Sequence, residues 1–333
     1  MNRKTILKTI VNTLKALALP ILVFVAFAIL TNGRSSSQRM IMTTLRQSVL
    51  PMLVCYSIML NMVVGMINFS AGAAILLSGI VGGSLALATG TGVLGVVLFS
   101  TITGISTGAL TGFIYIKLRV PCMVLTIGLM LAYEAMPRLV YPNGVNLTWT
   151  YTTLAVAPYC FVVAGIMIVI FYVISNLTAF GHNLRAIGSN QAIADSVGLN
   201  SDRSKFLSFL CGGLFIGIAA AMYVSTNAEV RPTTAIGSMV IMLDGFIGMF
   251  LAMFISRYCN LAIAIPISVV TMKMISNGFV SLGMSATIRD VTNGVLLLVL
   301  LTISANQGLF ERMKQNKLFA QKADAEYQST RTQ

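Results

Sequence analysis

The chain alternates between long apolar blocks and short polar breaks from near its N-terminus to about residue 305. A helix needs about 20 mostly apolar residues to cross the hydrocarbon core of a bilayer. Blocks of about this length predict ten membrane-spanning helices, over residues 16–31, 47–67, 69–89, 92–116, 121–140, 155–175, 205–226, 237–256, 261–281 and 287–305. We therefore expect an all-α polytopic membrane protein, with a transmembrane domain over 1–310 and a polar cytoplasmic tail over 311–333.

The second and third blocks are separated by few polar or small residues, namely Asn61, Asn68, Ser70 and Gly72. Such a junction is typical of a broken helix, whose irregular backbone is tolerated in a membrane where protein or a cavity covers it. We expect one broken or re-entrant helix at this point.

Composition and charge agree with a membrane location. Hydrophobic residues make up 56% of the chain and charged residues 9%, against about 25% charged in soluble domains. Lys and Arg gather at block ends, so the net charge of +13 gives no reason to expect nucleic-acid binding. With a cytoplasmic N-terminus, fifteen Lys and Arg fall in the cytoplasm and six outside, which predicts that both termini are cytoplasmic. Three of the external six are Arg34, Arg39 and Arg46, for which an amphipathic external helix is one explanation.

The N-terminal segment allows two interpretations. Basic residues before the apolar run Ala16–Leu30 are also typical of a signal peptide. Because the remainder is itself polytopic, we favour an uncleaved first span.

Two series of glycines stand at helical spacing: Gly104, Gly108 and Gly112, and then Gly213 and Gly217. Such spacing puts bare backbone on one helix face and lets a neighbouring helix approach closely. We interpret these glycines as helix-packing residues.

No set of residues indicates an enzyme. The five cysteines lie in distant blocks without CxxC spacing, and one histidine cannot build a metal site with them. No Gly-Lys pair occurs, which excludes a GxxxxGK[ST] phosphate loop. We expect no cofactor, no metal and no ATP hydrolysis by this chain.

Ionisable residues inside the blocks are few: Glu134, Asp244 and Lys273, with Arg289 and Asp290 near a boundary. Charge inside a membrane is costly, so each such residue is a functional hypothesis. Asp244 and Lys273 lie in neighbouring spans and can neutralise each other. They are either a structural ion pair or a relay for a proton or solute.

The polar segment 176–204 interrupts the apolar blocks and carries the histidine. Asn190 is a good N-cap for a short helix over Gln191–Val197, and Gly198 a good stop. Ile193, Ala194 and Val197 would give this helix one apolar face. Because so short a helix is marginal alone in water, we expect this face to dock on a partner.

These residues also carry a family resemblance. The run AIGSNQAIADSVGLNSDRSK and the Gly-rich helix after it resemble the signature region of permease subunits of ribose-type (simple-sugar) bacterial ABC importers. Positions that match are Gly188, Asn190, Ala192, Gly198, Asn200, Lys205, Gly212, Gly213 and Ala219. Further similar segments are Ile67–Gly79, Val120-Pro121, Tyr141–Gly144, the region from Ser276, and the acidic position Asp244.

The resemblance implies a permease in the cell membrane that moves a small polar solute, such as a simple sugar or furanoside. Implied partners are ATP-binding subunits, an extracytoplasmic solute-binding protein, a second permease chain and membrane lipid. It also implies a segment, Ala192–Gly198, that couples to the ATP-binding subunit; the coupling residues would be Gly188, Asn190, Ala192, Ile193, Ala194, Gly198 and Asn200. Candidate pathway residues are Asn61, Asn68, Ser70, Asp244 and Lys273.

The chain departs from the family pattern in places. Asn68 stands where the family usually has Asp, and a glycine-rich run after the eighth span is replaced by GFIGMFLAMFISRYCN from Gly245. We therefore expect a divergent member that pairs with a different, more typical permease or with itself. The rival interpretation is a self-contained secondary transporter that uses Asp244 and Lys273.

Overall fold

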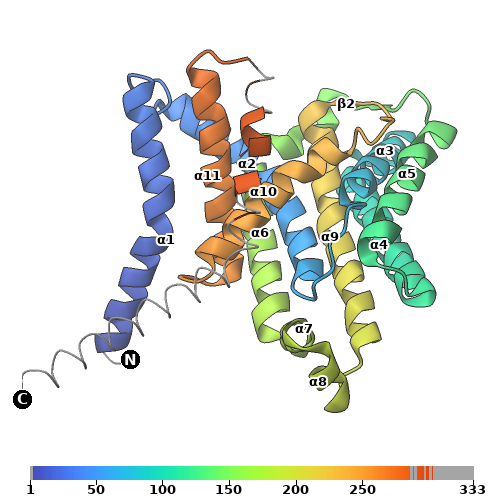
Figure 1. Ribbon diagram of the computed structural model, residues 1–333. Coiled ribbons are helices and arrows are strands. Elements are labelled where there is room, and N and C mark those ends of the chain that lie inside the picture. Colours follow the sequence, from blue (N-terminus) through green and yellow to red (C-terminus); the bar gives the residue numbers. More distant parts are fainter. Residues whose placement is uncertain (1–2, 286–287, 289–290, 296–297, 300–301, 303–333) are drawn as a thin grey trace, which may run out of the picture.

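The computed structural model describes residues 3–285, 288, 291–295, 298–299 and 302. Within them, nine helices correspond to the first nine predicted spans: α1 (Arg3–Leu30), α2 (Gln38–Met62), α3 (Ala71–Thr89), α4 (Gly92–Leu118), α5 (Cys122–Val140), α6 (Tyr159–Tyr172), α9 (Ser201–Asn227), α10 (Met239–Ile255) and α11 (Leu261–Ser281). The tenth predicted span lies mostly outside the described residues, and the tail 311–333 entirely so. Figure 1 shows most of the long helices packed side by side in one bundle, with α1 at its edge next to α11.

Several helices are long and apolar enough to cross a membrane. In the described part of the chain these are α3, α4, α5, α6 with its continuation to Leu177, α9 and α11, while Ala16–Leu30 and α10 are shorter apolar helices. Large apolar side chains stay exposed on the outer helices, for example Leu94, Phe113 and Val169. Such a surface suits lipid and not water.

Arg39 and Arg46, two of the arginines that were predicted to be external, belong to α2 and not to a separate surface helix. Ser37 caps α2, its Oγ accepting a hydrogen bond from Met40 N at 3.4 Å. Arg39 and Arg46 lie exposed on the first turns of α2, and Arg34 lies in the turn before it. Arg46 also holds a neighbouring loop, because its Nη2 donates to the carbonyl O of Ala155 at 3.0 Å.

The predicted helix break is confirmed between α2 and α3. Residues 63–70 are non-helical, and α5 satisfies part of their backbone. Thr126 Oγ1 accepts a hydrogen bond from Phe69 N at 3.1 Å, and Cys122 Sγ donates to the carbonyl O of Ile67 at 3.3 Å. The break is therefore covered by protein, as a membrane requires of irregular backbone.

Helix α9 forms the centre of the bundle, with α2, α3 and α4 packed around it. The two glycine series meet at the contact between α4 and α9. A Cβ on Gly104 would lie 2.5 Å from the Cα of Gly217, and one on Gly108 would lie 2.5 Å from the carbonyl O of Phe209. These helices approach backbone to backbone, as the glycine spacing predicts.

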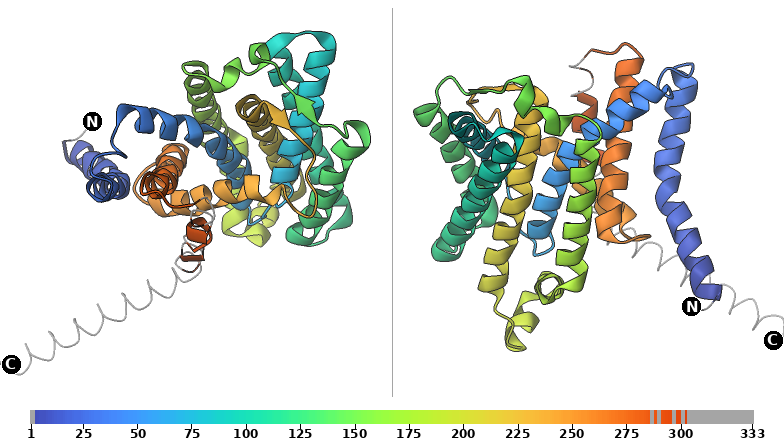
Figure 2. Two further views of the ribbon diagram at one scale, coloured as in Figure 1. Left: turned by 90° about the horizontal axis from the view of Figure 1, so that it is seen from above. Right: turned by 180° about the vertical axis from the view of Figure 1, so that it is seen from behind.

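The two ends of the bundle differ. At one end, α7 (Ala179–Ser189) and α8 (Gln191–Ser196) project below the long helices, on the same side as the start of α1 (Figures 1 and 2). The opposite end carries a small antiparallel ribbon that the sequence pattern did not predict. It pairs β1 (Val145–Asn146) with β2 (Glu229–Val230), with Val145 opposite Val230. Two 3-10 turns, η1 (Trp149–Tyr151) and η2 (Thr153–Ala155), follow β1.

Candidate functional site

Three helix caps lie at the projecting end of the molecule. Thr178 caps α7, Asn190 caps α8 and Asn200 caps α9; each side chain accepts a backbone hydrogen bond, at 3.2, 3.2 and 2.8 Å. Gly198 has φ +89° in the turn after α8, a conformation that glycine adopts without strain. Asn190 and Gly198 therefore have the local roles that the sequence predicts, although α8 ends at Ser196 and not at Val197.

Helix α7 was missed in the sequence. Its signal was present, since the Thr178 cap precedes Phe180, Leu184 and Ile187, spaced at i, i+4 and i+7. Leu184 and Ile187 are buried. Such a pattern predicts a helix packed on one face.

The apolar face of α8 differs from the predicted one. Ile193 and Val197 are 61% and 76% exposed, but Ala194 is 5% exposed. Ala194 therefore faces its own chain, and its assignment to a docking face was wrong. Helix α8 is held against α9 by Lys205, whose Nζ donates to Gln191 Oε1 at 3.0 Å.

The structure explains why a glycine stands at position 188, which the sequence motif alone does not. It lies at the end of α7, and a Cβ there would overlap the carbonyl oxygen of Val63, just past the end of α2. A glycine is required because α7 meets the beginning of the helix break at backbone distance. The projecting end is thus joined to the membrane bundle by close packing, while Ala192 stays exposed on α8.

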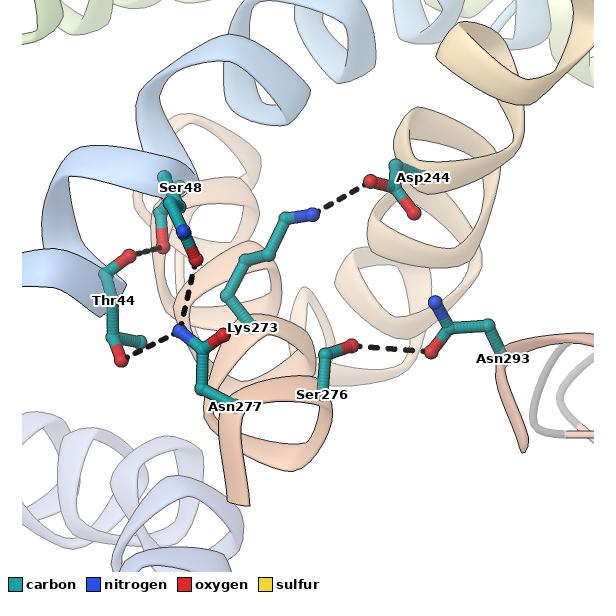
Figure 3. A network of polar contacts seen from close by, with 8 residues as sticks. Thr44, Ser48, Asp244, Lys273, Ser276, Asn277 and Asn293 are labelled. Atoms are coloured by element: carbon teal, nitrogen blue, oxygen red, sulfur yellow. Dashed lines mark hydrogen bonds and ion pairs between the residues drawn. The ribbon is translucent and has the colours of Figure 1, made fainter. Parts of the chain in front are cut away.

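A polar cavity lies at the opposite end of the bundle. It holds about 380 Å³ and is lined by α2, α9, α10 and α11 together with Asn293. Asp244 and Lys273 both line it and point toward each other, with Nζ of the lysine 2.6 Å from Oδ2 of the aspartate (Figure 3). The predicted ion pair is present. Its side chains are 32% and 16% exposed respectively, so the pair is partly solvated.

A row of amide and hydroxyl groups continues from this pair. Asn277 Nδ2 donates to Thr44 Oγ1 at 2.9 Å and to Gln47 Oε1 at 3.0 Å. Ser276 Oγ donates to Asn293 Oδ1 at 3.1 Å, as Figure 3 shows. The cavity wall therefore offers both hydrogen-bond donors and acceptors.

The other predicted pathway residues lie elsewhere. Asn61, Asn68 and Ser70 are buried, and they do not line this cavity. Asn68 Oδ1 accepts from both N and Oγ of Ser70 at the start of α3, and Asn61 Oδ1 accepts from Ser208 Oγ of α9 at 2.9 Å. In this structure they provide hydrogen-bond partners for polar groups in and next to the helix break.

Residues 40–303 match the protein family described as "Branched-chain amino acid transport system / permease component". The chain belongs to this permease family. The match covers the region from the first turn of α2 to residues beyond the end of α11.

Individual relatives of the permease carry transport names. This chain is 27% identical over 223 residues to the L-arabinose transport system permease protein AraH of Escherichia coli, and the match covers 61% of this chain and 62% of that protein. It is 26% identical over 207 residues to the probable ABC transporter permease protein YphD of the same organism, covering 60% and 61%. It is 26% identical over 179 residues to the galactofuranose transporter permease protein YtfT of Escherichia coli, covering 51% of each.

The matched part of the permease spans less than two thirds of the length of these relatives. No solved structure matches the chain. The sequence match thus shows the family, and the solute and the partner subunits are argued below from the residues of this chain.

Glu134 was recognised in the sequence as an ionisable residue within a span, but its hydrogen-bond partners were not predicted. Glu134 on α5 is 3% exposed, and its carboxylate accepts hydrogen bonds from Ile236 N at 3.1 Å and Ser238 N at 2.7 Å. Ala235 and Ile236 have φ values of +55° and +68°, a costly conformation for these residues. Glu134 therefore holds the start of α10, the helix that carries Asp244. No sequence signal joins a carboxylate to backbone N–H groups about a hundred residues away.

Proposed function

We propose that this permease is the transmembrane subunit of an ATP-driven importer for a small hydroxyl-rich solute, such as a simple sugar or furanoside. Its partners would be an ATP-binding subunit, an extracytoplasmic solute-binding protein and a second permease chain of the same or different sequence. The names of the relatives support this proposal, since they are transport permeases named for arabinose and galactofuranose.

The observation that carries the proposal is the exposed apolar pair on α8. Ile193 in α8 and Val197, the residue just past its end, have exposed side chains where α7 and α8 project from the bundle. Removing apolar surface from water is favourable by about 25 cal/mol per Å², so this pair is suited to insertion into a groove of a partner. The docking partner would be the ATP-binding subunit, which supplies the energy that this chain has no motif to supply.

Orientation follows from the same element. The projecting end would lie in the cytoplasm with both termini, in agreement with the excess of Lys and Arg predicted on that side. The cavity of Asp244 and Lys273 would then open toward the outside. Solute would enter there from the binding protein.

The cavity supports the solute class. Amide and hydroxyl groups of Gln47, Asn277 and Ser276 can exchange hydrogen bonds with hydroxyls of a solute, since such groups both donate and accept. Asp244 and Lys273 add a charged acceptor and a charged donor for hydrogen bonds with a solute, and because they neutralise each other, the pair carries no net charge. Closure of the ATP-binding subunits would move α7–α8 and switch the cavity between outward and inward access, a rigid-body change of a bistable bundle.

Replacement of Ile193 by Asp tests the proposal. It places a charge in the docking contact, where burial of an unpaired charge is costly, while no membrane-spanning residue changes. We expect normal membrane insertion, with co-purification of the ATP-binding subunit and solute uptake falling together. Asn143→Asp is the control, because it adds the same charge at an exposed residue on the opposite end of the molecule.

Retained co-purification and uptake in the Ile193→Asp variant would refute docking through α8. Uptake that persists in vesicles without any ATP-binding subunit would instead favour a secondary transporter built on Asp244 and Lys273. That alternative rests on the observed ion pair within the polar cavity.

A further inference from the structure

Two asparagines join the projecting end of the permease to its last described long helix. Asn176 lies in η3 (Val173–Leu177), a π-helical turn that ends α6. Its Nδ2 donates to Asn260 Oδ1, and Asn260 Nδ2 donates back to Asn176 Oδ1, both at 3.2 Å. Arg185 on α7 adds a third bond, from Nη1 to Asn176 Oδ1 at 3.3 Å. A continuous polar link therefore runs from α7 to Asn260.

Asn260 is also the N-cap of α11. Its Oδ1 accepts a hydrogen bond from Ala262 N at 3.0 Å. Lys273 lies thirteen residues further along the same helix, about 20 Å at 1.5 Å per residue. The residue that receives the link thus begins the helix whose lysine faces Asp244.

A cavity separates α7 from the turn between α10 and α11. It holds about 310 Å³, and its lining includes Asn176, Arg185, Asn260 and Ser256. Close packing transmits displacement because atoms in contact resist compression, but across a cavity those contacts are missing. The asparagine pair bridges this gap, so it is positioned to carry displacement that packing does not.

The near side of the link is rigid. A Cβ on Gly181, in the first turn of α7, would overlap the carbonyl oxygens of Ile174 and Ser175 in η3. Helix α7 and η3 therefore touch backbone to backbone. A displacement of α7 must move Asn176 with it.

We propose that the Asn176–Asn260 pair carries movement of α7–α8 into α11, and so sets the state of the cavity that Asp244 and Lys273 line. This inference rests on the proposed function, since it assumes that an ATP-binding subunit moves α7–α8. The two asparagines act as positioning residues: they do not line the cavity of Asp244 and Lys273, and they act through α11.

The alternative is a static clamp that merely holds the cytoplasmic turn in place. A clamp contributes stability but does not connect the nucleotide state to the cavity. The two roles are distinguished by a signal from the cavity that responds to nucleotide.

Asn227 provides the reporter position. It is exposed and lines the cavity from α9. In the complete complex purified through a tag on this chain and placed in lipid nanodiscs, the Asn227→Cys variant is treated with a membrane-impermeant maleimide. Labelling rates are compared without nucleotide and after trapping with ATP and vanadate, and the parent chain supplies the background from native cysteines.

Two variants weaken the link to different extents. Asn176→Leu removes both hydrogen bonds of the pair, together with the bond from Arg185, at similar side-chain size. Asn260→Asp keeps the acceptor for Ala262 N and for Asn176 Nδ2, and loses the donor to Asn176 Oδ1. Asn143→Leu, an exposed asparagine at the opposite end, is the matched control.

We expect the reporter chain with an intact link to show different labelling rates in the two nucleotide states. The ratio of these rates should fall toward one in Asn176→Leu, by about fivefold for each hydrogen bond lost. Asn260→Asp should be intermediate, and Asn143→Leu should be unchanged. ATP-binding subunit should still co-purify with every variant.

Unchanged ratios in Asn176→Leu, with or without a fall in thermal stability, would overturn the inference and leave a clamp, while the proposed function would stand. A ratio of one in the intact reporter chain with the ATP-binding subunit bound would also overturn it, because the cavity would then not respond to nucleotide. Failure of any ATP-binding subunit to co-purify with the parent chain would overturn the proposed function itself.

Discussion

The contact between α4 and α9 gives the sharpest test of how this bundle is held together. Gly104→Ala adds one methyl group where a Cβ would lie 2.5 Å from both Cα and N of Gly217 and 2.7 Å from the carbonyl O of Gly213. All three are backbone atoms, so no side chain can rotate away. Ordinary van der Waals contact begins at 3.4 Å, and the two helices must therefore separate by about 0.9 Å at this point.

The cost follows from that separation. When two atoms in contact are moved apart by about 0.5–1 Å, a quarter to a half of their van der Waals attraction is lost. The gap between α4 and α9 would extend along the neighbouring turns of both helices. Overpacking of this kind costs about 1–3 kcal/mol. We expect the upper half of this range for Gly104→Ala, because the obstruction is backbone on α9.

Gly165→Ala is the matched control. Gly165 lies within α6, and in the described part of the chain nothing comes within 4 Å of a Cβ built there. Both substitutions gain the same intrinsic helix preference of alanine over glycine, about 0.5–1 kcal/mol. The difference between the two variants therefore isolates packing.

The assay is thermal unfolding of the purified chain in mild detergent, followed by the loss of monodisperse protein on size-exclusion chromatography. Gly104→Ala should melt at least a few degrees below the parent, while Gly165→Ala should melt at or above it. Equal midpoints for the two variants would show that α4 and α9 are not in backbone contact and would refute the packing argument.

Three further predictions concern charge and orientation. Asp244→Asn leaves Lys273 without its anion and should lower stability by about 1–3 kcal/mol, whereas adding Lys273→Met should recover part of that loss in a double-mutant cycle; additive effects would argue against the pair. Glu134→Gln replaces one of two acceptor oxygens with a donor and should cost about 1–3 kcal/mol in the same melting assay; a neutral result would contradict the anchoring of α10. Single cysteines over 143–150 should react with impermeant maleimide added outside the cell and those over 185–200 should not; labelling of both stretches from one side would exclude the proposed topology.

The sequence predicted the features that local chemistry controls. Span positions follow from the length of apolar blocks, because a bilayer imposes the same length requirement on every helix; the span predicted over 261–281 coincides with α11. Caps are local as well, so Asn190 and Gly198 could be assigned from a few residues. Asp244 and Lys273 could be paired in advance since they lie on consecutive spans, which a short turn places side by side.

The tertiary structure decided which partner each polar group has and which face each short helix turns inward. Ala194 and Ile193 are neighbours with similar apolar character, yet packing of α8 against the bundle buries the first and exposes the second. Glu134 and the N–H groups of Ile236 and Ser238 come together because the segment that precedes α10 passes beside Glu134 of α5. Asn61, in the last turn of α2, and Asn68 and Ser70, in the helix break, are buried and do not line the cavity, since their hydrogen bonds are made with neighbouring backbone and side chains. The length of an apolar block and the cap of a helix depend on residues that are adjacent in the sequence. The partner of a buried polar group depends on contacts between segments that are distant in the sequence, and these contacts exist only in the folded chain.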